Sequence, residues 1–343
     1  MMAEQRESSF ELIRIIAQFF IVLYHLFCFF IYPVSENLFF KAIWLPLHIG
    51  VLLFVMISGY FGIKANIKGL IKLLGMMAVL YLPLSILYIC IYGYSLDLLQ
   101  ETVLWISSSP FWFMRTYLFL YLFSPVLNQY IYHCSNKQLF ALILILFFIS
   151  HYCGSIGYDS SLLMGKNLPT FMFLYVVGYA IKKYQHKWQK INIYYFALSY
   201  IILNLLLIII FSIWKGYFAN LIFEKVFFSY CSIGLLFSAI LFFLWIGGLK
   251  FYSPTINRIA KSSLTIYMLH GANLIFIGLI KPVVNWILYI SDNNIQIFIF
   301  TFIFAVVIVL SCIFIDTILQ PIWKLIQIGG SKLQTKWDSI IFN

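Results

Sequence analysis

Apolar residues recur along this chain in long stretches separated by short polar connections. A helix needs about 20 apolar residues to cross ~30 Å of hydrocarbon. About ten stretches meet that measure: residues 11–31, 44–63, 73–94, 110–131, 138–157, 168–182, 191–213, 226–246, 263–280 and 295–319. Only helices satisfy their backbone polar groups in lipid at this density of apolar segments. The pattern therefore predicts an all-α, polytopic membrane bundle.

The composition supports this prediction. Of the 343 residues, 63% are hydrophobic and only 10% are charged, whereas an average soluble domain is roughly 45–50% apolar and about 25% charged. A single large domain in water is excluded, because the chain lacks the charge to cover its surface. Disorder is excluded too, since there is ample apolar surface to bury. We expect one membrane domain over residues 1–343, in which residues 324–343 form a short basic cytoplasmic tail.

The distribution of Lys and Arg predicts the topology. With the N-terminus inside, 16 of these residues fall on the cytoplasmic side, five fall outside, and Arg115 lies within the fourth segment. Cytoplasmic loops are enriched in Lys and Arg, so both termini are predicted to be cytoplasmic. The same rule accounts for the net charge of +11, and no dense basic cluster suggests nucleic acid as a partner. The first segment carries polar residues and no cleavage site follows it, so we expect it to be retained.

Polar residues inside membrane helices mark functional sites or internal pairs. In the first segment they lie on one helical face: Glu11, Arg14, Gln18 and His25. Arg14 and His25 are eleven residues apart, about three turns or roughly 16 Å along a helix. Glu11 and Arg14 are spaced to pair at i,i+3. The alternative to a functional face is an anchoring ion pair at the helix start and one buried, hydrogen-bonded histidine.

Four other segments carry candidate chemistry. The ninth places Ser263, Tyr267 and His270 on one face, either for catalysis or to join helices through hydrogen bonds. Small residues at the end of the second segment, Ser58 among them, permit close helix approach. Lys64, Lys68 and Lys72 then form one basic face, for lipid or for the phosphates of a cytoplasmic donor. Trp112, Arg115 and Tyr117 in the fourth segment are candidates for substrate binding or belong to an aromatic belt, and Asp316 in the last is a candidate partner for a basic residue.

No metal site is expected. The cysteines are scattered without a metal-ligand spacing, at positions Cys28, Cys90, Cys134, Cys153, Cys231 and Cys312. The chain also lacks the GxSxG, HExxH and P-loop patterns of soluble enzymes.

Four motifs in order resemble the membrane-bound acyltransferase family 3, the bacterial O-acyltransferases of surface glycans. An acidic residue, an Arg and a His are matched by Glu11, Arg14 and His25. The other three matches are Phe54 to Tyr60, Trp112 to Asn128 (with Phe113, Tyr117, Ser124 and Pro125), and Ser263 to His270. The resemblance covers the chain from residue 6 to about 275. Two features depart from the family pattern: lysines stand at 64, 68 and 72 where many members have arginines, and Arg115 lies outside the pattern. The esterase-like domain that some members append is absent from this sequence.

The resemblance implies an enzyme of the bacterial cytoplasmic membrane. It would transfer acetyl from acetyl-CoA to a hydroxyl of a surface polysaccharide or its lipid-linked precursor, with glycan-assembly proteins as possible further partners. The catalytic residues would be His25, Glu11, Tyr267 and His270. Arg14, Ser58 and the three lysines would hold the donor, and Trp112 and Tyr117 the acceptor. Arg115 is a further candidate for acceptor binding, to which the resemblance assigns no role.

Two other functions fit the same polar residues. A transporter or flippase for a glycan precursor would use the polar face of the first segment as a substrate or proton path. A scaffold for glycan assembly would tolerate replacement of His25.

Overall fold

The computed structural model describes residues 7–31, 38–93, 95–107, 111–156, 164–214, 227, 229–272 and 274–341. Within these ranges the chain forms helices and connecting turns and no strand, which confirms the all-α prediction. Six helical segments are long and apolar enough to cross a membrane: Ser8–Ile31, Ala42–Phe61, Ile67–Tyr92, Asn136–Gly154, Ile193–Ile213 and Asn294–Ile318. Each coincides with one of the predicted stretches, so the chain is a multi-pass membrane protein.

The other four predicted stretches contain shorter or more polar helices. Helix α7 (Trp112–His133) covers the fourth stretch, α9 (Leu168–Lys183) the sixth and α13 (Ile233–Gly247) the eighth. The ninth stretch is divided between α15 (Ser263–Ala272) and α16 (Leu274–Ile290).

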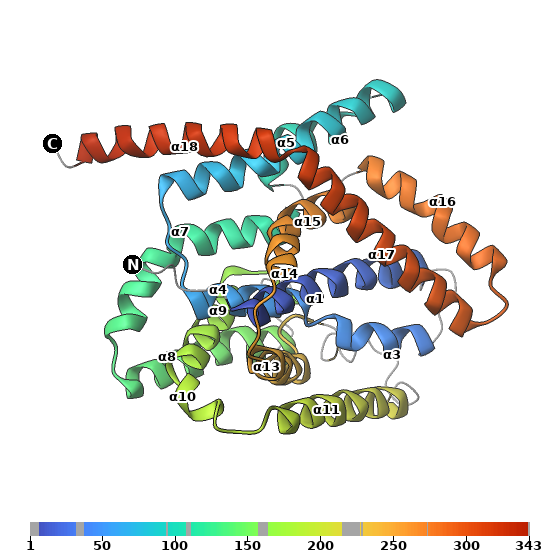
Figure 1. Cartoon of the computed structure of the whole chain (residues 1–343). Helices are drawn as coiled ribbons and strands as arrows, with labels where there is room; N and C mark the ends of the chain where they lie inside the picture. Colours follow the sequence, from blue (N-terminus) through green and yellow to red (C-terminus); the bar gives the residue numbers. More distant parts are fainter. Residues whose placement is uncertain are drawn as a thin grey trace. The chain divides into compact units, whose positions relative to one another are not determined.

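Figure 1 labels the helices along the chain. They form two compact units, each built from two separate parts of the sequence. Unit 1 comprises Met1–Ile63 and Thr116–Lys261, and unit 2 comprises Lys64–Arg115 and Ser262–Asn343. Helix α7 begins in unit 2 and continues in unit 1. The sequence analysis predicted a single membrane domain over residues 1–343. The two compact units do not test this prediction, which stays a prediction.

Unit 1 is built around α4 (Gly50–Phe61). The membrane segment that contains α4 is 72% buried, against 11% for the segment Ile193–Ile213 of α11 (Ile193–Trp214). Helices α1 (Ser8–His25), α9 and α13 pack against α4, so α4 forms the core and α11 presents its apolar side chains outward, as a lipid-facing helix does. The remaining elements of unit 1 are η1 (Leu26–Ile31), α3 (Leu38–Leu47), α8 (Asn136–Phe147), η4 (Phe148–Ile156), α10 (Gln185–Trp188) and α14 (Pro254–Ile259).

Two glycines allow α4 and α9 to approach closely. A Cβ atom at Gly59 would overlap the backbone of Tyr175, and one at Gly178 would overlap the backbone of Met56. Small residues at such contacts let helix backbones pack directly against each other in membranes. The expectation that the small residues at the end of the second segment permit close helix approach is confirmed.

Unit 2 contains the second group of helices. Helix α5 (Ile67–Tyr92) packs against α15, α16 and α18 (Gln320–Ile341), and α15 also packs against α17 (Asn294–Ile318). The helix α6 (Leu96–Val103) and the short η2 (Trp105–Ser107) complete the elements of unit 2. The short η6 (Ala260–Ser262) contains the boundary between the two units and leads into α15. The predicted basic tail at residues 324–343 is helical as far as the structure describes it, because α18 extends to Ile341.

We predict that Gly59→Ala destabilises the protein by about 1–3 kcal/mol, because the added methyl group forces α4 and α9 apart. The measurement is thermal unfolding of the purified protein in detergent, followed by circular dichroism. Gly278→Ala is the matched control, since nothing lies within 4 Å of a Cβ atom at this helical position. Equal melting temperatures for the two variants would contradict the close packing of α4 on α9.

Candidate functional site

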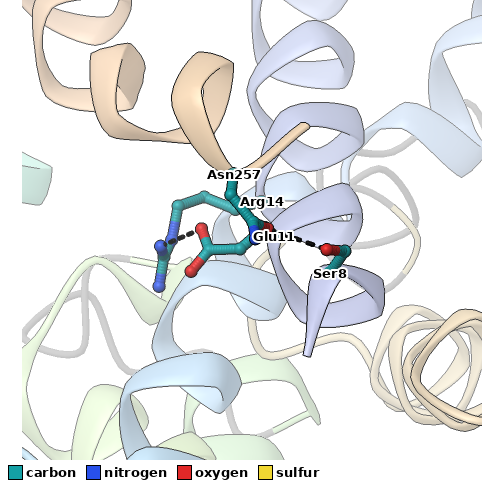
Figure 2. A network of polar contacts seen from close by, with 4 residues as sticks. All are labelled: Ser8, Glu11, Arg14 and Asn257. Atoms are coloured by element: carbon teal, nitrogen blue, oxygen red, sulfur yellow. Dashed lines mark hydrogen bonds and ion pairs between the residues drawn. The ribbon is translucent and has the colours of Figure 1, made fainter. Parts of the chain in front are cut away.

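The start of α1 is fixed to α14 by the hydroxyl group of Ser8. The Ser8 oxygen accepts a hydrogen bond from the backbone N–H of Ser253 at 2.8 Å, and the hydroxyl donates to Oδ1 of Asn257 at 3.0 Å (Figure 2). Ser253 in turn caps the N-terminus of α14. These bonds fix the first turn of α1. Glu11 and Arg14, two of the predicted site residues, follow on the same helix.

Glu11 and Arg14 form the ion pair that their spacing predicts. Nη1 of Arg14 donates to Oε2 of Glu11 at 2.5 Å. Figure 2 shows both side chains on the same side of α1. The side chain of Glu11 is 5% exposed and that of Arg14 is 25% exposed, so Glu11 is buried while Arg14 is partly exposed. A guanidinium has five N–H donors, and this bond engages one of them.

A second polar pair lies in the same unit and joins α4 to α7. The hydroxyl groups of Ser58 and Tyr117 are 3.1 Å apart, at hydrogen-bonding distance, and Ser58 also donates to the backbone oxygen of Phe54 at 3.0 Å. Arg14 is close enough to Tyr117 for an electrostatic interaction between the two side chains. Unit 1 thus brings together four residues predicted from three different motifs: Glu11, Arg14, Ser58 and Tyr117.

A closed ring of hydrogen bonds holds the end of α4 against α7 and α9. The Tyr175 hydroxyl accepts from the backbone N–H of Ile63 at 2.8 Å and donates to Oδ1 of Asn128 at 2.7 Å. Nδ2 of Asn128 completes the ring by donating to the backbone oxygen of Ile63 at 2.9 Å. The ring gives Asn128 of the third motif a structural role, and it adds Tyr175, which the sequence gave no reason to select.

His25 lies at the point where α1 changes its winding. The α-helix ends at His25 and continues as the π-helix η1, a form that occurs mostly as short segments and frequently at functional sites. The ring of His25 contacts the rings of Tyr24 and Phe29, with centroid distances of 5.8 and 5.1 Å. The sequence predicted the face on which His25 lies but gave no sign of the π-helix.

In unit 2, α15 carries the second predicted histidine. Nδ1 of His270 is 2.5 Å from the backbone oxygen of Ile266. A carbonyl oxygen only accepts hydrogen bonds, so this nitrogen carries a proton. Tyr267 packs against Phe113 at 5.3 Å and against the edge of His270 at 6.4 Å. The histidines His25 and His270 belong to different units.

Asp316 on α17 fastens the start of α15. This carboxylate is 3% exposed and accepts four hydrogen bonds, from Ser262 Oγ at 2.8 Å, Thr265 Oγ1 at 2.5 Å, Trp323 Nε1 at 3.0 Å and Gln320 Nε2 at 3.1 Å. The sequence favoured a basic partner, whereas these four donors are neutral. Hydrogen bonds from η6, α15 and α18 compensate for the burial of the Asp316 carboxylate. They also fix α15, the helix that carries Tyr267 and His270.

The remaining predicted residues lie in unit 2. Lys64, Lys68 and Lys72 are exposed, the last two on α5, as a basic surface requires. Trp112 begins α7, where its ring contacts that of Phe113 at 6.0 Å, and Arg115 lies half-buried one turn later. Among the described residues, no group of three or more His, Cys, Asp or Glu side chains is placed to hold a metal ion.

Comparison with known proteins identifies one family. A family model described as an acyltransferase domain matches residues 7–316, nearly the whole chain. No curated protein and no solved structure matches. The matched range begins one residue before α1 and ends at Asp316, so it includes every residue of the predicted site in both units.

We predict that the hydrogen bonds among Ile63, Asn128 and Tyr175 stabilise the protein cooperatively. Asn128→Ala and Tyr175→Phe each leave part-buried polar groups without partners, at a cost of about 1–3 kcal/mol. In the double variant the losses are less than additive, with a coupling of about 0.5–3 kcal/mol. Chemical unfolding of the four proteins in detergent measures this cycle. The control pair is Asn128→Ala with Tyr200→Phe, on α11, for which the losses in the free energy of unfolding should be additive. Additive losses for Asn128→Ala and Tyr175→Phe would contradict the ring of hydrogen bonds.

Proposed function

The chain belongs to this acyltransferase family, and from that membership we propose that it is a membrane O-acetyltransferase of the bacterial cytoplasmic membrane. It moves an acetyl group from cytoplasmic acetyl-CoA to a hydroxyl group of a surface polysaccharide or its lipid-linked precursor. The observation that carries the proposal is the polar face of α1. There a partly exposed arginine side chain, fixed by Glu11, lies about three helical turns from a histidine, in a segment long enough to cross the membrane.

The reaction requires a base, because an alcohol is a poor nucleophile until its proton is accepted. Histidine changes its charge near neutral pH, so His25 suits this role. In the proposed step a ring nitrogen of His25 takes the hydroxyl proton while the hydroxyl oxygen attacks the thioester carbonyl carbon. A C–O bond forms, the C–S bond breaks, and the leaving CoA thiolate receives the proton from His25. The products are the acetyl ester and CoA with a free thiol.

Arg14 is the proposed contact for the donor. A guanidinium binds phosphate oxygens through charge-assisted, often bidentate, hydrogen bonds. Glu11 holds the Arg14 side chain from one side, and Ser58 and Tyr117 lie beside it in the same unit. We assign Lys64, Lys68 and Lys72 to the donor phosphates as well, as point charges without the fork of an arginine.

Unit 2 supplies a second group of proposed residues. When the ring of His270 is neutral, its Nε2 is the nitrogen that can accept a hydrogen bond or a proton, and Tyr267 lies against the edge of this ring. We propose that these two side chains orient the thioester or His25. Trp112, Tyr117 and Arg115 are proposed to face the sugar acceptor.

We predict that His25→Ala abolishes acetyl transfer. Proton NMR of purified surface polysaccharide would be recorded from cells with the gene deleted, restored, or restored with the variant. Acetyl signals should disappear on deletion, return with the intact chain and stay absent with His25→Ala at equal membrane abundance. His133→Ala, a change of an exposed histidine at the end of α7, should restore them fully. If the deletion strain makes polysaccharide that keeps its acetyl groups but stays inside the cell, the protein is a transporter and not an acetyltransferase.

We predict that Arg14→Lys raises the KM for acetyl-CoA by about tenfold or more, because lysine keeps the charge and loses the bidentate hydrogen bond, a loss of about 1.5–3 kcal/mol. Initial rates in membrane preparations at a fixed acceptor concentration measure this effect. Arg258→Lys, at an exposed position on α14, is the matched control. An unchanged KM for Arg14→Lys would remove Arg14 from the donor site.

A further inference from the structure

Gln18 lies on the polar face of α1 and is buried, with 2% of its surface exposed. Its Nε2 atom is also buried and has no hydrogen-bond partner among the residues that the structure describes. A carboxamide nitrogen carries two N–H donors. Buried polar groups are normally paired, so an unpaired donor in a membrane segment indicates a binding partner from outside the fold.

Another buried amide in unit 1 shows how the fold treats such a group when its role is structural. Asn204 on α11 is 6% exposed. Its Nδ2 donates to Oγ of Ser238 on α13 at 2.9 Å and to the backbone oxygen of Tyr200 at 2.8 Å. Its Oδ1 accepts from the Ser238 hydroxyl at 3.2 Å. These bonds join α11 to α13, whereas Nε2 of Gln18 joins α1 to no described neighbour.

The position of Gln18 on α1 follows from the geometry of a single helix, because Ser8–His25 is one continuous α-helix. Gln18 comes four residues after Arg14 and seven before His25, which is about 6 Å and about 10 Å along the helix axis. The three side chains leave the helix within an arc of about 40°. Gln18 therefore lies between the proposed contact for the donor phosphates and the proposed base.

The acetyl-CoA molecule has a matching length. Its pantetheine arm, which contains two amide groups, joins the pyrophosphate to the thioester sulfur. About 13 bonds separate the nearer phosphorus from the sulfur, or about 15 Å in an extended chain, since three backbone bonds span ~3.3–3.6 Å. Arg14 and His25 are about 16 Å apart along α1. The amide carbonyl nearer to the phosphates lies about five bonds, or about 6 Å, along the arm, which is the level of Gln18.

We propose that Gln18 is a positioning residue for the acyl donor, whose Nε2 donates a hydrogen bond to this amide carbonyl oxygen. The inference rests on the proposed function, because it requires acetyl-CoA as the donor. With the phosphates at Arg14, the bond fixes the register of the arm along α1 and brings the thioester level with His25. Because Gln18 is covered, the arm moves neighbouring side chains aside when it binds.

Isothermal titration calorimetry of the purified full chain in detergent tests the proposal with two ligands. One is acetyl-CoA, and the other is adenosine 3′-phosphate 5′-diphosphate, which has the nucleotide and the phosphates but no arm. Gln18→Met keeps an unbranched side chain of the same length and removes the N–H donors. We expect this variant to bind acetyl-CoA about threefold to tenfold more weakly and to bind the diphosphate with unchanged affinity. Arg14→Lys should weaken the binding of both ligands.

The matched control is Asn204→Leu, which removes the amide that the fold itself pairs. It should lower the melting temperature in detergent and leave the affinity for both ligands unchanged. Gln18→Met should melt at or above the temperature of the intact protein, because no hydrogen bond within the fold is lost. Gln18→Leu serves as a second variant and should behave in the same way.

Three results would overturn the proposal. Unchanged binding of acetyl-CoA by Gln18→Met would show that the arm does not contact Gln18, and the proposed function would stand. A lower melting temperature with equal weakening of both ligands would give Gln18 a structural role, and the proposed function would again stand. An intact protein that binds neither ligand would overturn the proposed function, and this inference would fail with it.

Discussion

Several polar groups in the apolar segments of this chain find partners within the protein, because the surrounding hydrocarbon offers none. Glu11 meets Arg14, His270 meets the backbone of Ile266, and Asp316 meets four neutral donors. Each arrangement fixes a helix that carries candidate chemistry. The same constraint therefore shapes both the fold and the site: the side chains that satisfy buried polar groups also set the positions of the residues available for catalysis.

Local spacing was sufficient to predict part of this structure. The apolar stretches located the six membrane segments, and the i,i+3 spacing of Glu11 and Arg14 predicted their ion pair, because both depend on residues close in sequence. The small residues at Ser58 and Gly59 indicated close helix packing for the same reason. These features follow from the geometry of a single helix, which a sequence displays directly.

Contacts between distant residues were beyond the reach of such patterns. Tyr175 and Ile63 form a hydrogen bond across 112 residues of sequence, and Asp316 accepts a hydrogen bond from Ser262 across 54 residues. The sequence around each donor or acceptor does not indicate its partner. The neutral donors of Asp316 illustrate the difficulty, because a buried carboxylate in isolation suggests a basic partner. The π-helix after His25 is likewise invisible in the periodicity of its apolar residues. The division into two units, each formed from two parts of the chain, results from these long-range contacts.

The ring around Ile63 also has a consequence for biosynthesis. The ribosome delivers α4 first, and the partners of its terminal backbone groups follow 65 residues later at Asn128 and 112 residues later at Tyr175. At ordinary rates of translation the last partner arrives after on the order of ten seconds. During that interval the newly inserted α4 carries a polar end that interfacial water must satisfy. The nascent chain thus holds this end at the membrane surface until α7 and α9 are in place.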